Sequence, residues 1–171
     1  MKFTIHHGYE IPRDGNLITR SARCRRKFWE EIEADVEGLP EACGCYVLSI
    51  RNVPWYVGSA QKQDFKHECL SPHKITLYDA ALAAGLGKPY LHFIARRTPG
   101  GKFCKTSTTG YRDVLFLENM YIGMALQRNG NLQNVKGTAL LRDMRVPGFV
   151  NTRQGEGKAH AVQDLRTILG A

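Results

Sequence analysis

Apolar and polar positions along the chain follow two spacings, one typical of helices and one typical of strands. Residues 21–37 have a helical stripe, and Ser21 stands where an N-cap is expected. The apolar residues of this stripe are Phe28, Trp29, Ile32 and Val36. Gly38 and Pro40 end the predicted helix. Residues 1–20 contain several breakers and are expected to be irregular.

Two short β-type runs come next, at residues 45–50 and 54–58, with only Arg51, Asn52 and Val53 between them. A connection this short predicts an antiparallel hairpin. A third strand is expected at residues 90–95, followed by a loop over residues 98–110.

Three further helices are predicted. The first begins at Ser71-Pro72, an N-cap followed by proline in the first turn, and ends at Gly85. The second covers residues 111–126 and ends near Asn129. The third covers about residues 159–169.

This element order predicts an α+β fold: a small three-stranded antiparallel sheet flanked by helices, with N- and C-terminal extensions. We expect an N-terminal arm and helix over residues 1–41, a core over 42–137, and an extension over 138–171 that packs on the core. Together they are expected to form one globular domain, because 171 residues is an ordinary domain length.

No apolar run approaches the roughly 18–20 residues of a membrane span. The first 15 residues also lack the apolar segment of a signal peptide. The sequence therefore predicts a soluble, cytoplasmic protein without a membrane partner.

The chain has five cysteines, an odd number whose spacing matches no disulfide framework. Cys43 and Cys45 form a single C-x-C pair, whereas zinc sites usually combine two pairs. We expect reduced, mostly buried cysteines.

The net charge of +8 is unevenly distributed. Residues 1–41 hold seven Lys/Arg and eight Asp/Glu, whereas residues 42–171 hold seventeen and eight. A basic region of this kind fits a polyanionic partner such as nucleic acid, although it also fits an ordinary basic protein.

One acidic residue stands out within the predicted helix 111–126. The neighbours of Glu118 at helical spacing are Val114, Leu115, Tyr121 and Ile122. A carboxylate on such an apolar face needs a cation or strong hydrogen-bond donors. A divalent metal is one such cation, and an ion pair with Arg96 or Arg97 is the alternative.

Several motifs in sequence order resemble the GIY-YIG nuclease superfamily. Gly44-Cys45-Tyr46 stands for the first tripeptide of that family and Tyr56-Val57-Gly58 for the second. Glu118 lies on a later helix, as the family glutamate does, and Asn134 takes the place of the family asparagine. The resemblance covers residues 43–136.

The resemblance implies a metal-dependent endonuclease that hydrolyses DNA phosphodiester bonds. Tyr46 would activate the attacking water, and Tyr56 would position the water or the phosphate. Glu118 would bind Mg²⁺ or Mn²⁺, and Asn134 would orient the phosphate backbone or brace the site. One carboxylate with phosphate oxygens and waters is an ordinary Mg²⁺ arrangement. A free tyrosine has a pKa near 10, so water activation by Tyr46 needs positive charge nearby or a metal-bound hydroxide.

The chain departs from the family where an arginine and then a histidine usually follow the second tripeptide. Lys66 and Leu70 stand at those positions. The replacement candidates are Lys74 or Lys66 as the phosphate-binding cation, with His73 as a supporting donor near a helix start. Glu68 is either a second metal ligand or the ion-pair partner of a lysine.

A set of basic residues around the third strand is expected to contact nucleic acid: Arg96, Arg97, Lys102, Lys105 and Arg112. Such contacts depend on salt and do not read sequence. Double-strand cleavage with one site per chain would make a homodimer natural.

Two other classes of function stay open. One is a catalytically degenerate nucleic-acid-binding module on the same fold, which the missing arginine favours. The other is a metal- or thiol-dependent enzyme acting on a small molecule. The range of the family that the chain resembles implies restriction, mobile elements or phage defence as the biological context of a nuclease.

Overall fold

The computed structural model describes the chain except residues 1, 135–137, 151, 170 and 171. It divides into two compact units, Met1–Gln133 and Asn134–Ala171, and each is described by itself. The end of the expected core, residues 135–137, lies outside the described residues. Within the described residues the fold is α+β, as predicted.

A four-stranded antiparallel sheet forms the centre of the first unit, in the order β1-β6-β4-β5. Its strands are β1 (Lys2–Glu10), β4 (Gly44–Ile50), β5 (Val53–Ala60) and β6 (Pro89–Arg97). A separate two-stranded ribbon joins β2 (Arg13–Asp14) and β3 (Leu17–Ile18).

The expectation of an irregular N-terminus and three strands is wrong, because β1 adds a fourth strand along β6. Its pairing shifts register between Ile5 and Gly8, and Ile5 is 76% exposed. A bulge and an apolar residue facing solvent disturb the alternation that signals a strand. The pairing with β6, far along the chain, therefore left no local signal.

The predicted β4–β5 hairpin is confirmed. Arg51 and Asn52 connect the strands with φ values of 52° and 58°. Two successive left-handed residues are what a tight hairpin turn of type I′ requires. This turn sets the register that pairs Tyr46 with Gly58 and Leu48 with Tyr56.

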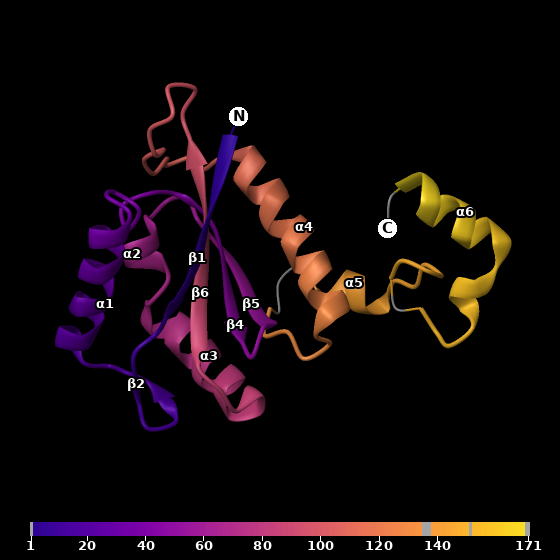
Figure 1. Ribbon diagram of the computed structural model, residues 1–171, viewed down its shortest axis with the longest axis horizontal. Helices are drawn as coiled ribbons and strands as arrows, with labels where there is room; N and C mark the ends of the chain where they lie inside the picture. Colours follow the sequence, from indigo (N-terminus) through magenta and orange to yellow (C-terminus); the bar gives the residue numbers. More distant parts are fainter. Residues whose placement is uncertain (1, 135–137, 151, 170–171) are drawn as a thin grey trace. The chain divides into compact units, whose positions relative to one another are not determined.

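Three helices cover one face of the sheet (Figure 1), and Tyr46 belongs to the core on that face. They are α1 (Ala22–Asp35), α2 (Phe65–Glu68) and α3 (Pro72–Gly85). The Ser21 side chain caps α1 by accepting a hydrogen bond from the backbone of Cys24, as expected. Phe28, Trp29 and Ile32 of α1 are buried in the same core.

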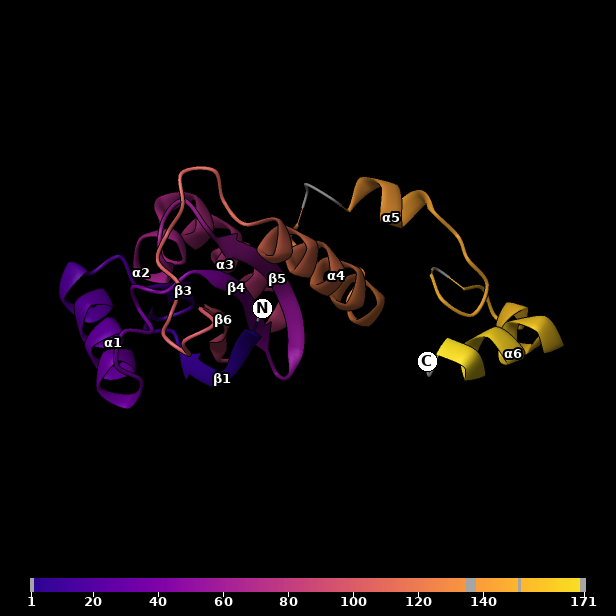
Figure 2. The same cartoon turned by 90° about the horizontal axis from the view of Figure 1, so that it is seen from above.

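Helix α4 (Arg112–Arg128) covers the opposite face, and Figure 2 shows it on the other side of β5 from α3. Its Val114 packs with Cys45 and Ile94. Because Cys45 and Tyr46 are consecutive strand residues, they point to opposite faces. The helix that carries Glu118 thus packs on the face away from Tyr46.

The second unit contains α5 (Ala139–Asp143), the 3₁₀ turn η1 (Glu156–Lys158) and α6 (His160–Leu169). Val146 and Val150 pair across a tight turn, and Arg145 forms an ion pair with Glu156 at 3.4 Å. The predicted final helix is confirmed as α6. The expected packing of this extension on the core stays a prediction.

Among the residues that the structure describes, no helix combines the length and apolar character needed to cross a bilayer. All five cysteines are free, and Cys24 alone is exposed. The expectation that most of the cysteines are buried is confirmed.

Candidate functional site

Gly44 and Gly58, the glycines of the two tripeptides, lie where a larger side chain would clash with neighbouring atoms. A Cβ on Gly58 would lie 2.4 Å from the Tyr46 hydroxyl oxygen, and one on Gly44 would lie 2.1 Å from the Ile94 carbonyl oxygen. Both distances are far inside van der Waals contact. Gly58 therefore lets the Tyr46 ring lie across β5, and Gly44 lets β4 approach β6.

Tyr46 is completely buried, and its hydroxyl finds no hydrogen-bond partner in the described chain. The Tyr78 hydroxyl of α3 is also buried without a well-formed hydrogen bond, but it lies close enough to Tyr46 for a weak contact that, against the larger effect of burial, acts to lower the pKa of Tyr78. Burial, followed by the neighbouring Tyr78, raises the pKa of Tyr46 well above the ordinary tyrosine value. A hydroxyl in this environment resists giving up its proton.

Tyr56 makes a different set of contacts on the same face. Its ring centroid lies 6.2 Å from that of Tyr46. Its hydroxyl oxygen accepts a hydrogen bond of 2.6 Å from the Lys74 ammonium, which also forms an ion pair of 3.3 Å with Glu68. The predicted lysine partner of Glu68 is therefore present.

Lys74 is held as a cation in a nearly enclosed position, with its side chain 14% exposed. Burial acts to lower the pKa of Lys74, but the hydrogen bond to Tyr56 and the charge of Glu68 raise it above the ordinary lysine value. The ammonium therefore persists at neutral pH. Two different helices and a strand position it, since Lys74 lies in the first turn of α3, Glu68 ends α2 and Tyr56 lies in β5.

Glu118 lies on the other face and takes a hydroxyl as its partner. Ser59 of β5 donates a hydrogen bond of 2.8 Å to its carboxylate, and Gln61 donates one of 3.1 Å to Ser59. Gln61 also accepts a hydrogen bond from the backbone of Tyr111, where α4 begins. The end of β5 therefore aligns the helix that carries Glu118. The alternative ion pair with Arg96 does not form, because Arg96 pairs with Asp113 at 2.8 Å.

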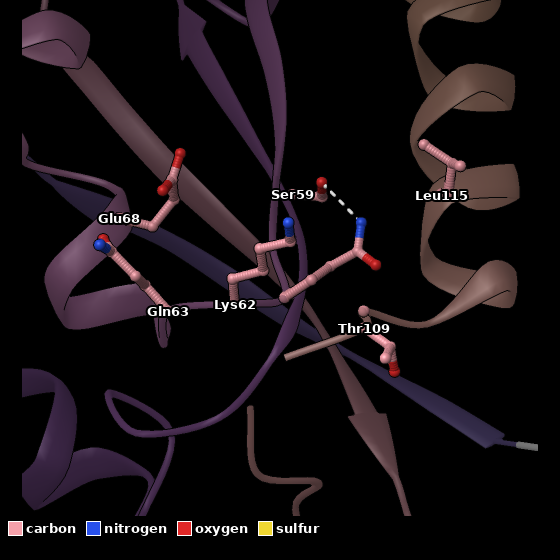
Figure 3. Close-up of a pocket in the computed structure, with 8 residues that line it drawn as sticks. Ser59, Lys62, Gln63, Glu68, Thr109 and Leu115 are labelled. Carbon is pink, nitrogen blue, oxygen red and sulfur yellow. Dashed lines mark hydrogen bonds between the residues drawn. The ribbon is translucent and has the colours of Figure 1, made fainter. Parts of the chain in front are cut away.

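A hollow of about 440 Å³ adjoins both groups, and we call it the β5–α4 cleft. Its lining residues are Ser59, Gln61, Lys62, Gln63, Glu68, Thr109, Gly110 and Leu115. Figure 3 shows Glu68 and Gln63 on one side, Leu115 of α4 on the other, and Lys62 beside Ser59 between them. Since β5 is an edge strand, a cleft at its end can adjoin groups from both faces of the sheet. On one face, Glu68 forms the ion pair with Lys74, which in turn contacts Tyr56. On the other face, Ser59 donates its hydrogen bond to Glu118.

The atoms at this cleft that could bind a metal are oxygen atoms of carboxylate, hydroxyl and carboxamide groups. Mg²⁺ prefers ligands of this type. In the described part of the chain, no three His, Cys, Asp or Glu side chains are grouped to hold a metal alone. Glu118 does not line the cleft itself and reaches it through Ser59, so its predicted role as a ligand of Mg²⁺ or Mn²⁺ stays a prediction. The lining residues do not form a closed protein cage.

Three predicted site residues lie elsewhere or stay open. Lys66 does not line this cleft but lines a second hollow with α1. His73 is exposed at the start of α3, beside Lys74 in sequence. Asn134 is buried but opens the second unit, so its predicted role beside Glu118 stays a prediction.

The expected nucleic-acid-binding residues fall into two groups. Three already have partners within the fold. Arg96 stacks on Tyr111 and pairs with Asp113, Arg97 stacks on Phe103 at 3.5 Å, and Lys105 pairs with Glu41 at 3.0 Å. Lys102 and Arg112 are exposed and have no ion pair among the described residues. The second group can meet phosphates without breaking contacts of the fold.

Sequence reasoning missed Ser59, Gln61 and Lys62. A signal was present, because these residues closely follow the glycine of Tyr56-Val57-Gly58. The end of a strand that carries a motif is a natural place for a site.

Comparisons with known proteins add no relative: no protein-family model, curated protein or solved structure matches this chain.

Proposed function

We propose that this protein is a metal-dependent endonuclease that hydrolyses phosphodiester bonds of DNA at the β5–α4 cleft. The observation that carries the proposal is the Lys74 ammonium, which contacts both the Tyr56 hydroxyl and the cleft residue Glu68. Transfer of a phosphoryl group to water needs a positioned cation to stabilise negative charge in the transition state, with polar groups beside it. Lys74, the Tyr56 hydroxyl and the Glu68 carboxylate are such groups. The motif order around these residues adds support.

Each residue has a role in the proposed reaction. Lys74 and Lys62 neutralise the phosphate charge, and Tyr56 orients the phosphate or the attacking water. Glu68, at the cleft wall, takes a proton from the attacking water while the water oxygen forms a bond to phosphorus. The P–O ester bond breaks, and the leaving sugar oxygen becomes a hydroxyl by taking a proton from solvent water. Glu118, held by Ser59, is the ligand for the metal.

Mg²⁺, when bound, supplies positive charge for the phosphate and a coordinated water of lowered pKa. Tyr46 is left out of the reacting set because its hydroxyl is buried and its pKa is raised. The role that the resemblance implies for Tyr46 would require that hydroxyl to reach the cleft.

The test compares wild type with Glu118→Gln and Lys74→Met on supercoiled plasmid and on single-stranded DNA. Each is incubated with Mg²⁺, with Mn²⁺ or with chelator. We expect metal-dependent cutting by wild type and a loss of about 100-fold or more in both variants. Glu31→Gln and Lys27→Met, which alter an exposed pair on α1 at 3.9 Å, are matched controls and should cut normally. Equal cutting by Glu118→Gln and Glu31→Gln would reject the site.

A second candidate is a binding module that has lost catalysis. The burial of the Tyr46 hydroxyl and the lysine at the place of the family arginine favour it. It predicts retention of DNA at low salt with no cutting under any metal condition.

A further inference from the structure

A second hollow lies between α1 and α2, with a volume of about 850 Å³, and we call it the α1–α2 cleft. Its charged lining residues are Arg25, Arg26, Glu30, Glu33, Glu41, Lys66 and His67. Helix α1 precedes the segment that carries the motifs, so no site residue of the proposed reaction lies on it.

Helix α2 is the wall between the two clefts. Its four residues place Lys66 and His67 in the α1–α2 cleft and Glu68 in the β5–α4 cleft. One helical turn is ~5.4 Å long, comparable with one or two nucleotide steps of ~3.4 Å. A strand held at the first cleft can therefore continue into the second.

Asp64 stabilises helix α2 at its N-terminus. It caps α2 by accepting a hydrogen bond from the His67 backbone, and it contacts the His67 ring nitrogen Nδ1 at 2.6 Å. The contact leaves the other ring nitrogen available to a ligand, and protonation of the ring would turn that nitrogen into a donor.

The acidic side chains of the cleft are mostly engaged within the fold. Glu33 accepts a hydrogen bond of 2.9 Å from the Gly38 backbone, and Glu41 pairs with Lys105 at 3.0 Å. Glu30 is exposed.

The basic side chains are less engaged. Arg26 and Lys66 are exposed and have no ion pair among the described residues. Arg25 donates two long hydrogen bonds of 3.4 Å to backbone carbonyls, and its buried Nε has no partner in the described chain. The cations of this cleft are therefore the groups available to an incoming anion.

We propose that the α1–α2 cleft is a second phosphate subsite, which binds the nucleic-acid strand where it continues from the β5–α4 cleft. The proposal rests on the proposed function in taking a nucleic-acid strand as the ligand of the first cleft. Arg26 and Lys66 supply the main contacts, with Arg25 and His67 beside them. The contacts are electrostatic and independent of base sequence.

The experiment measures binding of the full chain to fluorescein-labelled single-stranded DNA by anisotropy, with chelator present so that no cutting occurs. A dinucleotide, whose single bridging phosphate cannot reach both clefts, and an oligonucleotide of about 16 nucleotides separate one subsite from two. The cleft variant is Arg26→Ala with Lys66→Ala. The matched control is Arg23→Ala with Lys27→Ala, which removes the same charge from exposed positions of α1 outside the cleft lining.

We expect the cleft variant to bind the long oligonucleotide about tenfold more weakly at low salt and the dinucleotide as wild type does. The slope of log Kd against log salt for the long oligonucleotide should fall by about 1.4, or ~0.7 for each phosphate that the variant no longer neutralises. The control should keep the wild-type gain in affinity with length.

Equal behaviour of the cleft and control variants would overturn the subsite, as would a wild type that binds neither oligonucleotide. Failure of the proposed function gives a different result. Wild type would then cut no DNA with Mg²⁺ or Mn²⁺, while its binding still depended on Arg26 and Lys66.

Discussion

Removal of the Tyr46 hydroxyl should stabilise the protein. The hydroxyl is buried without a hydrogen-bond partner in the described chain, a state that costs about 1–3 kcal/mol relative to solvation in the unfolded chain. Tyr46→Phe removes that cost and leaves a void of about one water probe, ~12 Å³. At ~24 cal/mol per Å³ the void costs about 0.3 kcal/mol. The expected net gain in unfolding free energy is about 1–2 kcal/mol.

Urea unfolding followed by tryptophan fluorescence measures this gain. Both tryptophans, Trp29 and Trp55, are buried in the first unit, so the signal reports on the unit that contains Tyr46. A gain of ~1 kcal/mol should also raise the Tm by about 2–4 °C. Tyr78→Phe is the matched comparison, because its hydroxyl is equally buried beside Tyr46 and also lacks a well-formed hydrogen bond in the described chain. It should stabilise the unit similarly.

A loss of stability in Tyr46→Phe beyond about 0.5 kcal/mol would refute the reasoning, since it would mean that the hydroxyl has a favourable partner. The same variant tests the proposed reaction. We expect Tyr46→Phe to keep most of the cutting activity and Tyr56→Phe to lose about 100-fold. The resemblance implies the opposite for Tyr46, so loss of cutting in a stabilised Tyr46→Phe would place its hydroxyl in the reaction.

Three further predictions concern packing, surface charge and pH. Gly58→Ala should lower the unfolding free energy by about 1–3 kcal/mol, because its Cβ meets the Tyr46 ring. Gly123→Ala in α4 meets no neighbouring atom and should raise the unfolding free energy by about 1 kcal/mol. Urea unfolding measures both changes. Arg96→Ala should lower stability by about 2 kcal/mol because it removes the ion pair with Asp113, whereas Lys102→Ala should only reduce the salt dependence of DNA binding. Burial, and then the nearby His7, lowers the pKa of His92 in the folded protein. As pH falls below about 6.5, His92 is therefore protonated in the unfolded chain before it is protonated in the folded one. Stability should therefore fall from pH 7 towards the lower pKa of the folded state, and His92→Gln should flatten that part of the curve; an unchanged curve would contradict this assignment.

The elements that the sequence predicted well are those whose signals are local. Helix α3 begins at Pro72 and ends at Gly85, as its cap and breaker residues indicate. The β4–β5 hairpin follows from two β-type runs separated by only residues 51–53, and the structure shows left-handed φ values at Arg51 and Asn52. In both cases, residues close in sequence supply the interactions that define the element.

Strand β1 could not be predicted in this way. Its partner β6 lies far along the chain, and the register shift between Ile5 and Gly8 breaks the alternation. Its stability comes from backbone pairing with a distant strand, which leaves little trace in local hydrophobic spacing.

The sequence by itself determined the α+β class, the main helices and the candidates Tyr56, Lys74 and Glu118. Tertiary structure alone decided how these groups meet. Strand alternation puts the tyrosines and Glu118 on opposite faces of the sheet. At the end of edge strand β5, one cleft is lined both by Glu68, the partner of Lys74, and by Ser59, the partner of Glu118. Tertiary packing also closed the Tyr46 hydroxyl away from water while leaving Lys74 charged, because burial and partners depend on which distant side chains surround each group.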